Sequence, residues 1–152
     1  ISLGATVATK KVFNAFLSNK KNMEFMHGPT YMANPLACSA ANATIDYFEK
    51  YKVLSKVREI EKFFKENLTS FNKYNFVTDT RYLGAIGVIE IKDLNFKKLK
   101  WLREEFIKRG VWVRPLRNVI YFMPPFVIKK NQLEKVFNAT LDIFDLWQKQ
   151  KK

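Results

Sequence analysis

Two prolines and a glycine fall close together in residues 25–35, and this segment limits the fold of the chain more than any other feature. Pro29 and Pro35 lack the backbone N–H that a helix interior or a central strand requires, and Gly28 weakens both structures. We therefore expect an apolar loop here. Asn34 followed by Pro35 is the pattern of a helix N-cap and a first helical residue, so the loop should lead directly into a helix.

Apolar periodicity predicts an α+β organisation for the rest of the chain. Helices are expected at residues 10–18, 35–50, 53–68, 96–109 and 132–147. Strands are expected at residues 1–9, 77–82, 85–91, 111–115 and 119–123, with the last two forming a hairpin. A strand at residues 1–9 would need neighbours that the chain does not contain, so we expect the chain to be a fragment of a longer protein.

The net charge of +13 and the isoelectric point near 9.8 allow two interpretations of the lysines. Clustered basic residues bind nucleic-acid phosphates without sequence preference. Here, however, the lysines are scattered and alternate with apolar residues at helical spacing, which is typical of the solvated faces of amphipathic helices. They include Lys50, Lys52, Lys56, Lys62, Lys65, Lys97, Lys98 and Lys100. We favour solvated helix faces and no nucleic-acid partner, and a basic nucleic-acid-binding domain is the alternative of another class.

His27 and Cys38 are the only residues of their types in the chain. A single cysteine excludes an internal disulfide and a cysteine-based zinc site, and a single histidine excludes a histidine-rich metal centre. We interpret both residues as structural. No apolar run approaches the ~20 residues needed to cross a bilayer. The sequence therefore predicts a cytoplasmic protein with no metal site and no membrane partner.

Thr30 is the first candidate for a binding role. It follows Gly28 and precedes the predicted helix at residues 35–50. A hydroxyl, the backbone amides that a glycine leaves accessible and a helix dipole together make an anion site suited to phosphate. A tight structural loop in which Thr30 satisfies its own backbone is the other interpretation.

Arg114 is the second candidate, because it stands near the end of a predicted strand. A guanidinium there can form a bidentate pair of hydrogen bonds with a carboxylate in a pocket. The aromatic residues Trp112 and Tyr121 on either side indicate an enclosed setting. An ordinary surface arginine remains the alternative.

Residues 27–38 read His-Gly-Pro-Thr-Tyr-Met-Ala-Asn-Pro-Leu-Ala-Cys, which resembles the phosphate-loop segment of the class III, fold-type-I aminotransferases. Residues 81–90, 110–115 and 120–125 resemble further segments of this family. Most members carry a sequence similar to His-Gly-Ser/Thr-Thr-Phe-Gly-Gly-Asn-Pro. Pro29 and Met32 therefore point to one branch, which takes its amino group from S-adenosylmethionine.

The resemblance implies an α/β fold-type-I architecture for the whole protein. Residues 1–50 would be the C-terminal part of its large domain, which binds pyridoxal 5'-phosphate and carries the phosphate loop. Residues 51–152 would be a C-terminal small domain with a small, mostly antiparallel sheet packed by helices. For the present chain alone, the expected fold class is α+β.

The resemblance also implies roles for individual residues. Gly28, Pro29 and Thr30 would hold the phosphate of the cofactor bound by the partner subunit of a homodimer, in active sites shared between two chains. Pro29 would border the substrate channel, Arg114 would hold the carboxylate of the oxononanoate substrate, and Tyr121 would line the same pocket.

The implied reaction moves the amino group of S-adenosylmethionine to 8-amino-7-oxononanoate, both small molecules, in biotin biosynthesis. A class III enzyme for ornithine, aminobutyrate or another ω-amine is the nearest alternative. The lysine that forms the Schiff base would lie upstream of Ile1, so no catalytic residue is assigned here. We expect this chain alone to be inactive.

Overall fold

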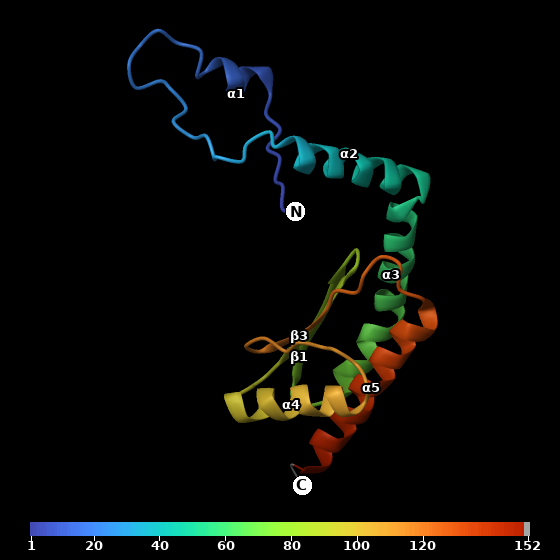
Figure 1. Ribbon diagram of the computed structural model, residues 1–152. Helices are drawn as coiled ribbons and strands as arrows, with labels where there is room; N and C mark the ends of the chain where they lie inside the picture. Colours follow the sequence, from blue (N-terminus) through green and yellow to red (C-terminus); the bar gives the residue numbers. More distant parts are fainter. Residues whose placement is uncertain (151–152) are drawn as a thin grey trace. The chain divides into compact units, whose positions relative to one another are not determined.

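The computed structural model describes residues 1–150, and the chain forms two compact units, Ile1–Tyr51 and Lys52–Lys152 (Figure 1). Residues 151 and 152, at the end of the predicted small domain, lie outside the described residues. The assignment of residues 1–50 and 51–152 to a large and a small domain stays a prediction. No helix within residues 1–150 combines the length and the apolar character needed to span a bilayer.

The first unit contains two helices, α1 (Lys10–Asn14) and α2 (Pro35–Lys50). The helix α2 begins where the sequence predicts. The side-chain oxygen of Asn34 accepts hydrogen bonds from the backbone N–H of Leu36 at 3.0 Å and of Ala37 at 3.3 Å. Because these amides have no partner within the helix, the Asn34 cap fixes the first turn of α2.

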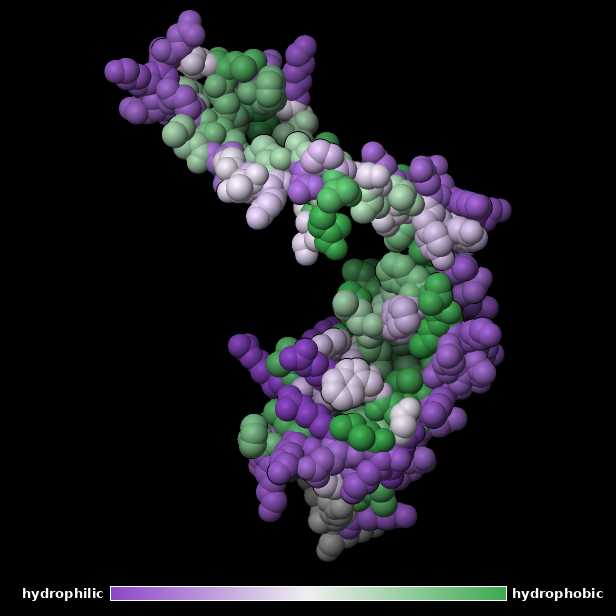
Figure 2. Space-filling model, in the orientation of Figure 1, coloured by the Kyte–Doolittle hydropathy of each residue, from purple (hydrophilic) through white to green (hydrophobic). Residues whose placement is uncertain are grey.

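The strand predicted at residues 1–9 is absent, and that prediction is wrong. A strand requires a neighbour that pairs with its backbone, and no described residue is paired with residues 1–9 in the sheet. Ile1 and Val7 are 82% and 95% exposed, and Figure 2 shows hydrophobic side chains open to solvent in this first unit. The helix α1 also ends earlier than the predicted range of 10–18.

The second unit has the expected α+β composition. In chain order its elements are α3 (Val53–Asn67), the 3-10 helix η1 (Leu68–Lys73), β1 (Val77–Leu83), β2 (Ile86–Ile91), α4 (Phe96–Lys108), β3 (Val119–Phe122) and α5 (Lys130–Gln150). The strands form one antiparallel sheet in the order β1-β2-β3 (Figure 1). The predicted small antiparallel sheet packed by helices is therefore confirmed, whereas η1 was not predicted.

One face of the sheet is buried against the helices, and β2 shows this most clearly. Gly87, Ile89 and Ile91 are buried, whereas Val88 and Glu90 are only half-buried. Successive side chains of a strand point to opposite faces, so the first three face the core and the other two face outward. The register places Tyr121 of β3 opposite Val88, on the outward face.

The core between sheet and helices is built mainly from aromatic rings. The ring centroid of Phe137 on α5 lies 5.0 Å from that of Phe122 on β3 and 5.8 Å from that of Phe64 on α3. Gly87 allows α3 to approach the sheet, because a β-carbon there would lie 3.2 Å from the ring of Phe64. Aromatic pairs at these separations contribute about 0.5–1.5 kcal/mol each beyond the burial of their area.

The helix α4 ends as the sequence predicts. Gly110 has a φ of +65°, and its N–H donates to the carbonyl of Ile107 at 2.9 Å. This left-handed conformation is accessible to glycine at little cost, so Gly110 ends the helix and redirects the chain.

The strand predicted at residues 111–115 is not part of the sheet, so the expected hairpin is reduced to one isolated bridge between Leu116 and Val119. The side chains of residues 111–115 alternate between the core and solvent, as those of a strand would. The backbone of this segment, however, is not hydrogen-bonded to a strand of the sheet. Pro115 contributes to this result because it has no N–H to donate. The buried positions are Val111, Val113 and Pro115, and the exposed ones are Trp112 and Arg114.

Candidate cofactor and substrate site

Residues 29–34 form two consecutive turns. The N–H of Met32 donates to the carbonyl of Pro29 at 2.9 Å, and the N–H of Asn34 donates to the carbonyl of Tyr31 at 3.3 Å. Ala33 occupies the third position of the second turn with a φ of +53°. This is the left-handed region of backbone conformation, which favours glycine over alanine.

The chemistry of Gly28 and Thr30 fits a phosphate group. Thr30 is exposed, and a β-carbon built on Gly28 would meet no atom within 4 Å, so the backbone around Gly28 is accessible. The first amides of α2 are already taken, because Leu36 and Ala37 donate to Asn34. An anion here would therefore be held by the hydroxyl of Thr30 and by loop amides, and not by the capped amides of α2.

His27 is exposed and Cys38 is half-buried. The ring of His27 is 5.6 Å from that of Phe25, and the ring of Phe25 is 5.2 Å from that of Phe16. The backbone N–H of His27 donates to the carbonyl of Phe25 at 2.8 Å. Cys38 is half-buried on α2. The structural interpretation of both residues stays a prediction.

Arg114 and Tyr121 line the same hollow of ≈ 540 Å³ in the second unit. The structure thus brings together the two residues to which the family resemblance gave a shared pocket. Buried apolar side chains complete part of the lining, including Val113, Phe122 and Phe137. Trp112 also lines the hollow but is 82% exposed. The setting of Arg114 in this chain is therefore open, and not enclosed as its aromatic neighbours indicated.

Backbone and side-chain hydrogen bonds hold the segment that carries Arg114. The N–H of Val111 donates to the carbonyl of Phe106, at the end of α4, at 3.1 Å. The guanidinium of Arg103 on α4 donates to the carbonyl of Pro115 at 3.2 Å. Arg103 could not be identified from the sequence, because nothing in the spacing of α4 residues signals a bond to a distant backbone carbonyl.

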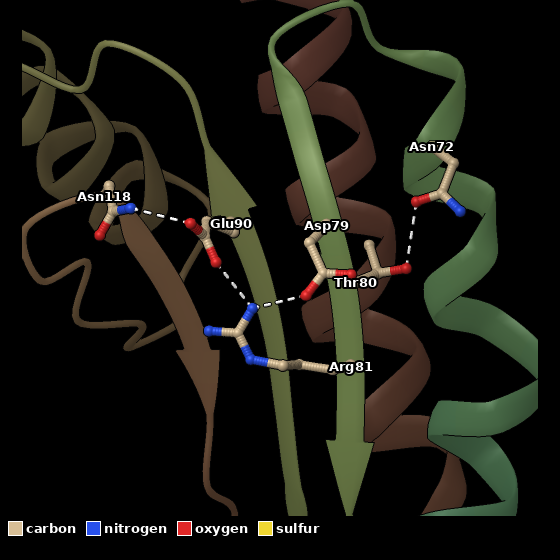
Figure 3. Close-up of polar contacts among 6 residues, drawn as sticks. All are labelled: Asn72, Asp79, Thr80, Arg81, Glu90 and Asn118. Atoms are coloured by element: carbon tan, nitrogen blue, oxygen red, sulfur yellow. Dashed lines mark hydrogen bonds and ion pairs between the residues drawn. The ribbon is translucent and has the colours of Figure 1, made fainter.

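A polar network fixes the turn that follows Arg114 (Figure 3). Arg81 on β1 forms ion pairs with Asp79 at 2.6 Å and with Glu90 at 2.7 Å. The second carboxylate oxygen of Glu90 accepts a hydrogen bond from the side-chain amide of Asn118 at 3.1 Å. Glu90, and to a lesser degree Asp79, raises the pKa of Arg81 above its ordinary value. The network joins the outward face of β1 and β2 to the residue before β3.

The family model described as aminotransferase class-III matches residues 1–144 of this chain. The chain therefore belongs to the class III aminotransferase family, and the resemblance inferred from residues 27–38 is confirmed. Class III aminotransferases depend on pyridoxal 5'-phosphate.

Individual relatives of this chain share one name within the family. The adenosylmethionine-8-amino-7-oxononanoate aminotransferase of Buchnera aphidicola subsp. Schizaphis graminum is 41% identical over 139 residues, which cover 91% of this chain and 32% of that protein. The protein of the same name from Helicobacter pylori is 31% identical over 151 residues, covering 95% and 35%. The chain thus spans about a third of the length of the curated relatives it matches.

Solved structures agree with the sequence comparison. The crystal structure of adenosylmethionine-8-amino-7-oxononanoate aminotransferase from Methanocaldococcus jannaschii superposes with a TM-score of 0.75 at 27% identity, covering 88% of this chain and 34% of that one. An aminotransferase from Bacillus anthracis superposes with a TM-score of 0.77 at 18% identity, covering 90% and 34%, which supports the fold alone.

Proposed function

We propose that the protein to which this chain belongs transfers the amino group of S-adenosylmethionine to 8-amino-7-oxononanoate, giving 7,8-diaminononanoate for biotin biosynthesis. The observation that carries the proposal is the segment at residues 27–38, with Pro29 and Met32 in place of the residues common in the class. The names of the relatives at 31–41% identity support the same donor and acceptor. Class III enzymes for ornithine, aminobutyrate or another ω-amine are not favoured by these names.

Residues 28–30 would hold the phosphate of pyridoxal 5'-phosphate. When bound, this cofactor supplies the electron sink for amino transfer. The hydroxyl of Thr30 would donate a hydrogen bond to a phosphate oxygen, and Gly28 would let a backbone amide approach the anion without a side chain in the way. Pro29 would border the substrate channel. We assign these contacts to the cofactor of the partner subunit in a homodimer.

Arg114 would bind the carboxylate of the oxononanoate acceptor. Its planar guanidinium presents parallel N–H donors that match the two carboxylate oxygens. Tyr121 lines the same hollow and would contact the bound acceptor. With the distant carboxylate held in this way, the ketone of the acceptor is oriented toward the amino group that it receives, which lowers the entropic part of the barrier.

Two properties of the whole protein complete the proposal. We place it in the cytoplasm, because the single cysteine of this chain fits a reducing compartment. No lysine of this chain is assigned to the Schiff base, so amino transfer is a property of the longer protein.

The test compares amino donors in the full-length protein loaded with pyridoxal 5'-phosphate. With 8-amino-7-oxononanoate as acceptor, S-adenosylmethionine, ornithine and 4-aminobutyrate are each supplied, and 7,8-diaminononanoate is quantified by mass spectrometry. The proposal predicts that 7,8-diaminononanoate forms when S-adenosylmethionine is the donor and does not form with ornithine or 4-aminobutyrate. Product with ornithine or 4-aminobutyrate and none with S-adenosylmethionine would assign the protein to the alternative branch of class III.

A further inference from the structure

The segment that carries Arg114 lies outside the sheet, so its position depends on a small number of hydrogen bonds. Its backbone is tied at one end by the N–H of Val111 and at the other by the two bonds between Leu116 and Val119, at 2.9 and 3.0 Å. Pro115 has no N–H, so it cannot donate a bond of its own between these ends. The carbonyl of Pro115, the residue after Arg114, accepts a hydrogen bond from a side chain.

Arg103 supplies that bond from the neighbouring helix α4, at 3.2 Å. A hydrogen bond with a charged donor is roughly twice as strong as a neutral one. The contrast with Arg109, the C-cap residue of the same helix, is informative. Arg109 donates to the carboxylate and the backbone carbonyl of Glu105, so its side chain bonds back to α4. Arg103 instead links α4 to the segment that carries Arg114.

We propose that Arg103 is a positioning residue for substrate recognition: by holding the Pro115 carbonyl, it keeps Arg114 at the hollow that it shares with Tyr121. The inference rests on the proposed function of Arg114. Arg103 itself does not contact the substrate in this account. Its effect should therefore concern the acceptor carboxylate, and not the amino transfer step.

The experiment compares 8-amino-7-oxononanoate with its methyl ester as acceptors for the full-length enzyme. The ratio of the two kcat/KM values measures recognition of the carboxylate, because a general loss of folding or of cofactor lowers both values alike. Four variants are compared with the wild type: Arg103→Met, Arg103→Lys, Arg114→Met and Arg109→Met. Arg109→Met is the matched control, since it removes an arginine at the end of α4 whose side chain bonds to Glu105 and not to the segment.

Arg103→Met should lower the free-acid to ester ratio on the order of fivefold, the scale of one charge-assisted hydrogen bond. Arg114→Met should lower it further, Arg103→Lys should recover part of the ratio, and Arg109→Met should leave it at the wild-type value. Arg103→Met should also raise the KM of the free acid more than it lowers kcat.

Two results would overturn the inference in different ways. An unchanged ratio in both Arg103 variants, together with a lowered ratio in Arg114→Met, refutes the positioning role and leaves the role of Arg114 intact. An unchanged ratio in Arg114→Met removes the proposed carboxylate contact, and with it the inference about Arg103. Should Arg103→Met not fold, Arg103→Lys decides between the outcomes, because it keeps the charge and a donor but loses the planar fork.

Discussion

The hydroxyl of Tyr74 donates a hydrogen bond to the carboxylate of Asp145 at 2.7 Å, and this contact joins residues 71 positions apart in the sequence. Tyr74 follows η1 and is buried, with 1% of its surface exposed, whereas Asp145 lies on α5. The bond therefore fastens the C-terminal helix to the segment that leads into the sheet. Burial, followed by the hydrogen bond to Asp145, raises the pKa of Tyr74.

Replacement of Tyr74 by Phe should lower the free energy of unfolding of this chain by about 1 kcal/mol at neutral pH, because the ring is kept and the hydrogen bond is lost. The raised pKa adds a second expectation. A tyrosine whose pKa is higher in the folded state contributes stability that is present below its unfolded pKa of about 10 and is lost as the pH rises above it. Thermal melting at several pH values should show this decline in the wild type and a smaller one in Tyr74→Phe; equal declines contradict the account.

Glu105 gives the opposite dependence on pH. Its side chain accepts hydrogen bonds from Lys108 at 2.7 Å and from Arg109, and these, with Lys108 first, lower its pKa. A carboxyl group with a lowered folded-state pKa contributes stability above its unfolded pKa of about 4.3, and this is lost as the pH falls through the folded-state value. Glu105→Gln should have a lower free energy of unfolding than the wild type at neutral pH. This free energy should then decline less than that of the wild type as the pH falls. Glu104→Gln, at the exposed neighbouring position, is the control and should behave as the wild type in both respects.

The sequence predicted helix ends correctly where they depend on interactions between neighbouring residues. Asn34 and Pro35 specify the start of α2 through a side chain and its nearest amides, and Gly110 specifies the end of α4 through its own backbone. The two failed strands depended on distant partners. Residues 111–115 alternate correctly between core and solvent, but alternation reports which side chains are buried and not which backbone groups are paired.

The roles of the candidate site residues stay predictions, but the structure shows where these residues lie. Thr30 and Arg114 could be singled out because their residue types stand in informative local settings, and the structure places Arg114 and Tyr121 at one hollow. Arg103 could not be found in this way, since its importance lies in a bond to the carbonyl of Pro115, 12 positions along the chain. Every residue has a backbone carbonyl, so the residue type at the acceptor position does not indicate such a hydrogen bond.

Ala33 provides a test of the turn beside the phosphate loop. A positive φ costs a non-glycine residue about 1–2 kcal/mol, and the cost is larger still for a β-branched side chain. Ala33→Val in the full-length protein should therefore weaken the binding of pyridoxal 5'-phosphate on the order of tenfold, whereas Ala33→Gly should bind it at least as tightly as the wild type. Ala43→Val, at an exposed position within α2, is the control for a valine in this unit. Equal dissociation constants for Ala33→Val and Ala43→Val would contradict the importance of this turn.

Thr30 tests the phosphate contact itself. Thr30→Val keeps the shape of the side chain and removes the hydroxyl, so the dissociation constant of pyridoxal 5'-phosphate should rise on the order of tenfold, the value of one hydrogen bond to a charged group. Thr30→Ser keeps the hydroxyl and should stay close to the wild type. Fluorescence titration of the full-length protein measures both constants. Equal affinity in Thr30→Val and the wild type would show that the hydroxyl does not reach the phosphate.

The most direct test of the proposed function uses the full-length protein, loaded with pyridoxal 5'-phosphate, and S-adenosylmethionine as the only added substrate. The visible absorbance band of the bound cofactor is followed after mixing, and ornithine is added to a parallel sample. Our account predicts that the band is lost with S-adenosylmethionine and persists with ornithine, because the first half of amino transfer requires only the donor. A band that persists with S-adenosylmethionine and disappears with ornithine would contradict it.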